Sequence, residues 1–203
     1  MNCAAPDEGN ILLLDKVTTP SQRNKYLAPL SRGDMRSSFS MTEPSPGAGA
    51  DPDQLATRAT KTAGGWVING NKWFITGADG AGFSIVMART EEGATMFLVD
   101  GDNPGMNVVR NLDTLDSAFT GGHGEVSFEN CTVSDDAVLG EVGKGFEYAQ
   151  VRLGPARLTH CMRWLGAARR AHEVAVEYSS RVYSSSSLGA RSGQTGTQRN
   201  VYC

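Results

Sequence analysis

The chain has 203 residues, 39% of them hydrophobic and 20% charged, and a formal net charge of −3 at pH 7. This length suits one or two packed domains and excludes both a peptide and a large multidomain enzyme. The balance of 19 basic against 22 acidic residues argues against a nucleic-acid-binding protein. No apolar run approaches the roughly 18 residues of a membrane span, so we expect a soluble protein. Glycine is in excess, with 24 residues, which predicts β structure or phosphate-binding loops.

The cysteines and the N-terminus indicate an intracellular protein. The four cysteines are dispersed, and no pair has the spacing of a metal site or a redox motif. The N-terminus shows neither a signal peptide nor a transit segment. Its residues resemble the interior of a domain, so we expect a chain that is incomplete at this end.

Residues 10 to about 40 are expected to be helical. Ile11–Leu14 form an apolar run, and Thr19–Gln22 is typical of the start of a second helix, with proline at its first position. Ser31–Asp34, which contains Gly33, predicts the end of that helix.

Residues 41–143 carry short apolar segments separated by turn-forming residues. Asn69-Gly70, between Trp66–Ile68 and Asn71–Ile75, predicts a hairpin, because both central residues of a type I′ turn need a positive φ. Several strands with no helix between them predict a β-sandwich or a small barrel. The further strands are expected at Phe83–Ala88, Thr95–Val99, Met106–Val109 and Glu125–Phe128.

Beyond Gly145 the apolar period becomes that of one long amphipathic helix. A single helix cannot bury its own apolar stripe, so we expect this helix to need partners. After Ser180 a serine-rich segment without periodicity predicts a disordered tail. The stripe consists of Cys161, Trp164, Leu165, Ala168, Ala171, Ala175 and Tyr178, opposite Arg163, Arg170, Glu173 and Glu177.

General catalytic motifs are missing from the sequence. It contains no GxGxxG after a strand, no GxxxxGK[ST] and no HExxH. His123, His160 and His172 have no metal-ligand spacing, so we expect surface or packing histidines and no metal site. Spacing assigns no Ser/His/Asp or Cys/His triad.

Two segments together resemble a known family. Thr42–Pro44 precedes the Gly-rich Gly47–Asp51, and Ile68–Thr76 follows the pattern Ile-Asn-Gly-x-Lys-x-(Trp/Phe)-Ile-(Thr/Ser). This double motif resembles that of the acyl-CoA dehydrogenases, flavoenzymes with a β-barrel domain between two α-helical domains. Gly145–Glu147 suits the start of the C-terminal domain of that family, and Arg157–Arg163 is most similar to the branch of members 10 and 11.

The resemblance covers about residues 5–180 and implies an α+β fold with a central β-barrel domain between partial helical domains. We therefore expect a chain that is truncated at both ends. The implied domains are the end of the N-terminal helical domain at 1–40, the barrel at 41–143, the first helix of the C-terminal domain at 144–180 and the disordered tail at 181–203.

FAD is the implied cofactor. A flavin needs hydrogen-bond donors along the edge that carries N5, O4 and O2, and an apolar or aromatic wall. In the family, the positions of Met41 and Thr42 meet this edge, and Phe74, Ile75 and Thr76 would supply the wall and a further donor. For Phe74 and Ile75 the alternative is plain barrel core. The expected cofactor-binding set is Phe39, Met41, Thr42, Gly47, Gly49, Phe74, Ile75 and Thr76.

An acyl-CoA is the implied substrate. Gly47–Ala50 would turn close to cofactor and thioester, and Ala50 stands where many relatives have a hydrogen-bonding serine. Arg157 matches a family arginine near the CoA end of the substrate, where a cation favours phosphates. A solvated arginine is the alternative for this position.

The implied reaction is the α,β-dehydrogenation of fatty acid β-oxidation, which converts an acyl-CoA to the trans-2-enoyl-CoA. In the family the base is a carboxylate of the C-terminal helical domain, downstream of the end of this chain. Glu173 and Glu177 match no catalytic position, so no catalytic residue is assigned. The resemblance also implies electron-transfer flavoprotein as acceptor, a homo-oligomer when complete, and a mitochondrial or peroxisomal location.

Two alternatives stay open. The chain is either an enzyme of this kind or a non-catalytic fragment or interaction module built on the barrel. Within the fold, related acyl-CoA oxidases and flavin-dependent monooxygenases share the middle-domain motifs, so these motifs do not separate them.

Overall fold

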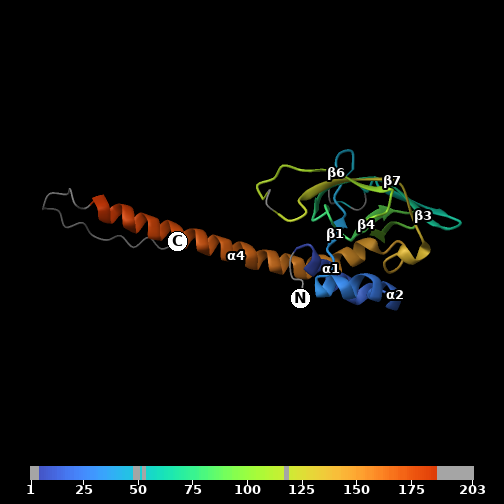
Figure 1. The fold of residues 1–203 in the computed structure, drawn as a ribbon, viewed down its shortest axis with the longest axis horizontal. Helices are drawn as coiled ribbons and strands as arrows, with labels where there is room; N and C mark the ends of the chain where they lie inside the picture. The colour runs from blue at the N-terminus through green and yellow to red at the C-terminus, as the bar shows by residue number, and fades with distance from the viewer. Residues whose placement is uncertain (1–4, 48–50, 52–53, 117–118, 187–203) are drawn as a thin grey trace. The chain divides into compact units, whose positions relative to one another are not determined.

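The structure is a computed structural model that describes residues 5–47, 51, 54–116 and 119–186 (Figure 1). It contains two compact units, one up to Arg157 and one from Leu158 onward. None of the described helices is both long enough and apolar enough to cross a membrane.

The first unit begins with a helical segment, as predicted. Thr19 and Gln22 form a capping box, in which the Thr19 hydroxyl accepts from the Gln22 N–H at 3.3 Å and the Gln22 amide oxygen accepts from the Thr19 N–H at 3.1 Å. Gly33, with φ 86°, ends the segment in the left-handed region. The elements are α1 (Asp7–Val17), α2 (Pro20–Gln22), the π-helical turn η1 (Arg23–Leu27) and α3 (Ala28–Arg32).

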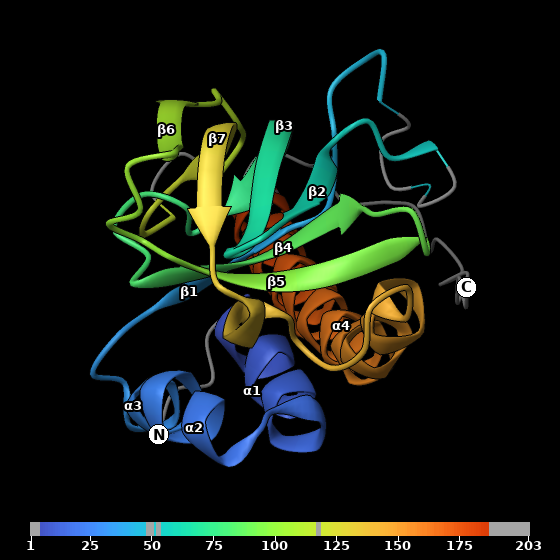
Figure 2. The same cartoon turned by 90° about the vertical axis from the view of Figure 1, so that its right-hand side faces the viewer.

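Seven strands form one curled sheet in the order β1-β4-β2-β3-β7-β6, and β5 pairs with β4 (Figure 2). The α+β fold and the four further strands predicted from the sequence are confirmed. The strands are β1 (Ser37–Ser40), β2 (Arg58–Thr62), β3 (Gly65–Thr76), β4 (Phe83–Arg89), β5 (Ala94–Asp100), β6 (Met106–Asn111) and β7 (His123–Val133).

The prediction of helix up to about residue 40 is wrong for β1. This strand pairs in parallel with β4, Ser37 lying opposite Phe83. Its serines are buried because the fold gives their hydroxyls partners: Ser40 and Ser84 hydroxyls lie 2.7 Å apart. These partners come from distant segments, so the local sequence carries no signal for the strand.

The predicted Asn69-Gly70 hairpin turn is also wrong. β3 runs unbroken through both residues, and the turn between β2 and β3 lies at Ala63-Gly64. Gly70, with φ 151°, instead lies at an irregularity in the pairing of β3 with β7. A Cβ at Gly70 would lie 2.6 Å from the Thr57 Cα, so this strand position requires glycine for its backbone and for the close approach of Thr57.

Strands β4 and β5 are buried on both faces, which explains their nearly continuous apolar sequences. Successive side chains point to opposite faces of a strand. One cluster packs Phe83, Ile85, Met87, Met96 and Leu98 against the helices, with Leu13, Leu14, Tyr26, Leu27 and Leu30; the other packs Val86, Ala88, Phe97 and Val99 with Trp66, Ile68, Ile75, Val126 and Phe128.

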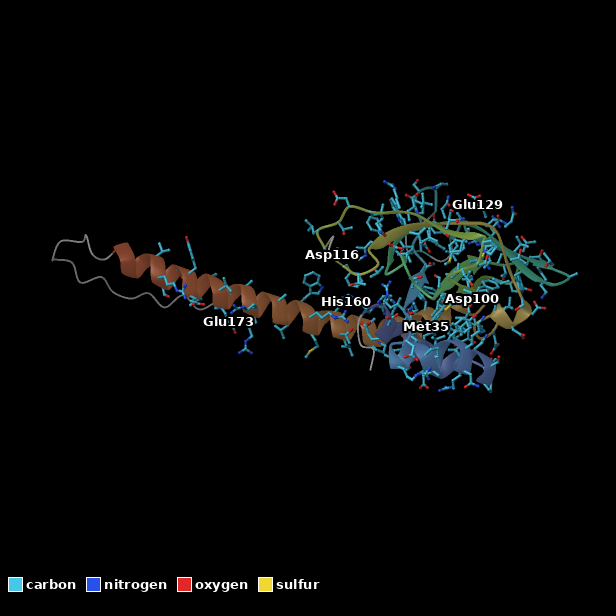
Figure 3. All side chains as sticks on the ribbon, viewed as in Figure 1. Met35, Asp100, Asp116, Glu129, His160 and Glu173 are labelled. Atoms are coloured by element: carbon cyan, nitrogen blue, oxygen red, sulfur yellow. The ribbon has the colours of Figure 1, made fainter. Side chains whose placement is uncertain are left out.

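The long helix α4 (Gly145–Ser186) confirms the predicted C-terminal helix and continues six residues past Ser180. In the second unit its predicted apolar stripe is exposed; the side chains of Trp164 and Leu165 are 71% and 67% accessible. Figure 3 shows His160 and Glu173 projecting from this helix. Of the predicted tail, residues 187–203 lie outside the described residues.

The two described cysteines should differ strongly in reactivity. Cys131 lies in the sheet core, where burial raises the pKa of its thiol to about 11, whereas Cys161 is exposed on α4. We expect iodoacetamide to modify Cys161 at least about a hundredfold faster than Cys131 in the folded chain. Peptide mass mapping measures both rates, and labelling in urea should remove the difference. Equal rates in the folded chain would contradict the burial of Cys131.

Candidate functional site

The two family-like motifs meet where β1 ends beside β3. The Trp73 N–H donates to the Thr42 carbonyl at 3.1 Å, which fixes the segment after β1 to the middle of β3. The next residue, Phe74, has φ 52°, an unusual backbone conformation for a bulky residue. Its ring is 50% exposed and lies 5.0 Å from the Trp73 ring. The structure thus presents an aromatic face and a partly buried threonine on neighbouring segments.

A buried ion pair holds this arrangement from inside. The Lys72 ammonium, with a fully buried side chain, donates to the Glu43 carboxylate at 2.8 Å and to the Met41 carbonyl at 3.0 Å. The Glu43 carboxylate also accepts from the backbone N–H of Ala56 at 2.6 Å and of Thr57 at 2.9 Å. Glu43 and Lys72 belong to the two motifs, so their contact joins the motifs in space.

Burial and charge oppose each other at this pair. Burial by itself raises the pKa of Glu43, but the Lys72 charge and the hydrogen bonds to the carboxylate outweigh burial and hold this pKa below its ordinary value. Burial lowers the pKa of Lys72 to about 8 against the opposing attraction of Glu43. The pair is therefore ionised near neutral pH, and each charge depends on the other.

A second hydrogen-bonded chain lies at the far end of β3. Thr76 lies opposite His123 in the β3–β7 ladder, and its hydroxyl is 3.0 Å from His123 Nδ1. His123 Nε2 lies 3.0 Å from both carboxylate oxygens of Asp116. The sequence predicts only a surface or packing histidine here. Because Thr76 and His123 are far apart in the chain, the register of the sheet is the signal needed to find this contact.

The other predicted site residues lie in different surroundings. Ile75 is 1% exposed in the sheet core, and Met41 is buried too. The Phe39 ring packs under the Arg152 guanidinium at 4.1 Å. Gly47 follows the turn after Pro44, where a Cβ would collide with the Glu43 side chain.

The last three predicted site residues are Gly49, Ala50 and Arg157. Gly49 and Ala50 lie outside the described residues. Arg157 is exposed on α4, with its guanidinium 3.5 Å from the Gln150 amide oxygen. Among the described residues, no group of His, Cys, Asp and Glu could hold a metal ion.

Two family models match the chain: the acyl-CoA dehydrogenase middle domain at residues 38–131 and the acyl-CoA dehydrogenase C-terminal domain at residues 143–189. The chain belongs to the acyl-CoA dehydrogenase family. FadE2 of Mycobacterium tuberculosis, named as an acyl-CoA dehydrogenase, is 43% identical over 84% of this chain and 44% of its own length. Acyl-CoA dehydrogenase family member 10 of Mus musculus is 39% identical over 84% of this chain and 17% of its own length.

Solved structures of acyl-CoA dehydrogenases share the fold. One from Mycobacterium abscessus is 41% identical, with a TM-score of 0.80 over 88% of this chain and 45% of its own. Butyryl-CoA dehydrogenase from Megasphaera elsdenii is 33% identical, with a TM-score of 0.66 over 70% of this chain and 38% of its own. The chain thus spans less than half the length of these relatives, and the matched part holds the junction of the two motifs.

Proposed function

We propose that this chain forms part of an FAD-dependent acyl-CoA dehydrogenase that introduces an α,β double bond into acyl-CoA thioesters. One observation carries the proposal: the buried Glu43–Lys72 pair joins the two family motifs at a surface that presents Phe74 beside Thr42. Family membership supports the same reaction, since that reaction is the family's.

The residues at this surface suit a flavin. Phe74 offers an exposed aromatic face and Thr42 a donor hydroxyl, which are the wall and the donor that an isoalloxazine ring needs, and Thr76 offers a second hydroxyl. The left-handed backbone at Phe74 is a local cost of about 1–3 kcal/mol that is typical of binding sites. Bound FAD would supply a two-electron acceptor. A related glutaryl-CoA dehydrogenase from Mycobacterium smegmatis, 27% identical, has been solved in complex with FADH2.

The chain's own residues would bind and orient both ligands. Thr42 and Thr76 would hydrogen-bond the flavin edge, and Phe74 would cover the ring. The segment that begins at Gly47 would lie against the thioester, and Arg157, exposed on α4, would attract the phosphates of CoA. Because water weakens such contacts, the sheet core beneath Phe74 would help by excluding water from one side of the ring.

The partner and location follow from the family in the same way. We infer that electron-transfer flavoprotein accepts the electrons and that the protein functions as a homo-oligomer in mitochondria or peroxisomes. In a solved structure of the electron transferring flavoprotein of Acidaminococcus fermentans, the similar chain is 30% identical over 70% of this chain. Imaging of a tagged protein and light scattering would test location and assembly.

FAD binding by the full chain is the first test. We expect the chain refolded with FAD to retain a flavin spectrum that acyl-CoA shifts but does not bleach, because no catalytic base is assigned in this chain. Thr42→Val should weaken FAD binding about tenfold, since one hydrogen bond is lost, whereas Thr60→Val, on an exposed β2 position, should not. A chain that retains no FAD would overturn the proposal in favour of a non-catalytic module. Bound FAD whose spectrum acyl-CoA leaves unchanged would contradict thioester binding at this site.

A further inference from the structure

The chain of contacts from Thr76 through His123 to Asp116 is built more firmly than a chance surface contact. The His123 side chain is only 15% exposed, and the Phe119 ring lies 5.4 Å from its imidazole. Asp116, on the loop between β6 and β7 (Figure 3), also accepts from the Thr114 hydroxyl at 2.9 Å. His123 and Asp116 are therefore each held by a further contact.

These contacts fix the direction of each hydrogen bond. The hydrogen bond from His123 lowers the pKa of Asp116, so Asp116 is an ionised carboxylate that can only accept. His123 Nε2 must then carry the proton that it shares with Asp116. In an uncharged imidazole the other nitrogen, Nδ1, is an acceptor, so the Thr76 hydroxyl has to donate its one proton to Nδ1. Thr76 is left with lone pairs alone for any other partner.

We propose that His123 and Asp116 are positioning residues that make the Thr76 hydroxyl a hydrogen-bond acceptor toward flavin N5. This inference rests on the proposed function, in which Thr76 meets the flavin edge. N5 accepts hydrogen bonds in an oxidised flavin and donates one, as N5–H, in a reduced flavin. An acceptor at Thr76 therefore favours the reduced form of the cofactor. The site is arranged in advance for the charge and proton distribution that follows hydride uptake.

The first experiment needs no flavin. Nitrogen-15 NMR of histidine-labelled full chain at pH 8 should show His123 as the Nε2–H tautomer, with its signals assigned by their loss in His123→Phe. Asp116→Asn should give a mixture of tautomers, because an amide both donates and accepts. Asp113→Asn is the matched control, since it removes a carboxylate of the same exposed loop that forms neither a hydrogen bond nor an ion pair with His123. A doubly protonated or Nδ1–H ring in the unchanged chain would overturn the inference.

The second experiment measures the flavin midpoint potential of the FAD-loaded chain. Asp116→Asn should lower the ratio of reduced to oxidised flavin at a fixed potential about fivefold, which equals about 20 mV for a two-electron couple. Loss of a nearby negative charge alone would shift the potential the other way, and Asp113→Asn measures that effect. Thr76→Ser should keep the potential of the unchanged chain, because the hydroxyl is retained.

A double-variant comparison tests whether Asp116 acts through Thr76. In a Thr76→Val background, Asp116→Asn should have no further effect on the potential. An equal shift with and without the hydroxyl would contradict the positioning role. If the unchanged chain binds no FAD, the proposed function fails and the inference fails with it. If FAD binds but the tautomer or the potential differs from expectation, only the inference fails.

Discussion

Replacing Lys72 with methionine should lower the free energy of unfolding by about 3–5 kcal/mol. The substitution leaves the Glu43 carboxylate ionised inside the protein without its counter-charge. Among the described residues, the N–H groups of Ala56 and Thr57 are the hydrogen-bond donors that remain. Urea unfolding of the full chain, followed by the fluorescence of the buried Trp66, measures the loss. Lys144→Met is the control, because Lys144 pairs with Glu147 at 3.4 Å on the surface and should cost less than about 1 kcal/mol.

A double-mutant cycle measures the interaction between Glu43 and Lys72 separately from their contacts with other residues. Glu43→Gln alone should destabilise by a similar amount, because the Lys72 ammonium then lacks its counter-charge. The double variant should lose about 2–3 kcal/mol less than the sum of the two single losses, because no buried charge is left over. Additive losses would show that the two side chains do not depend on each other. FAD binding should weaken in both single variants, since the pair connects the two motifs.

The pH dependence of stability gives a second measure of the same pair. The pKa of Glu43 is lower in the folded protein than its ordinary value of 4.5. Its contribution is therefore complete above about that pH and is lost as the pH falls through the folded pKa, because the unfolded chain binds the proton first. The free energy of unfolding should fall more steeply on acidification in the unchanged chain than in Glu43→Gln.

The sequence predicts those parts of this protein that local chemistry decides. Thr19, Gln22 and Gly33 are within a few residues of the helix ends that they form, so the sequence predicts a helix start at Thr19 and a helix end at Gly33. The strands at β4 and β5 were found because each is a short apolar run between turn residues. The motif around Glu43 and Lys72 gave the family, although composition and spacing alone gave no catalytic site.

The features that the sequence does not predict are contacts between distant segments of the chain. Glu43 and Lys72 are 29 residues apart, and Thr76 and His123 are 47 apart. No local pattern shows that a lysine in an alternating strand is fully buried, or that a histidine among glycines lies opposite a threonine. Both contacts require the register of β3 against its neighbours. The cofactor and substrate roles of all the predicted site residues stay predictions.

The second large loss of stability is expected at Gly70, which the sequence predicts in a hairpin turn. Gly70→Ala should destabilise the protein by about 2–4 kcal/mol, through steric crowding and an unfavourable backbone conformation. The added Cβ would lie 2.6 Å from the Thr57 Cα, and the residue has φ 151°. Because Thr57 also donates its N–H to Glu43, displacement of this segment should disturb the buried pair as well.

Gly64→Ala is the matched control for this substitution. Gly64 lies in the turn that does join β2 and β3, and a Cβ there would meet nothing within 4 Å. We expect it to change the free energy of unfolding by less than about 0.5 kcal/mol. Urea unfolding of the two variants distinguishes a continuous strand at Asn69-Gly70 from an exposed hairpin turn. If Asn69-Gly70 were an exposed hairpin turn, Gly70→Ala would strain only that turn and leave the contact between Thr57 and Glu43 intact. A large loss at Gly70 that also weakens the coupling between Glu43 and Lys72 is expected only where the glycine lies inside β3, pressed against Thr57.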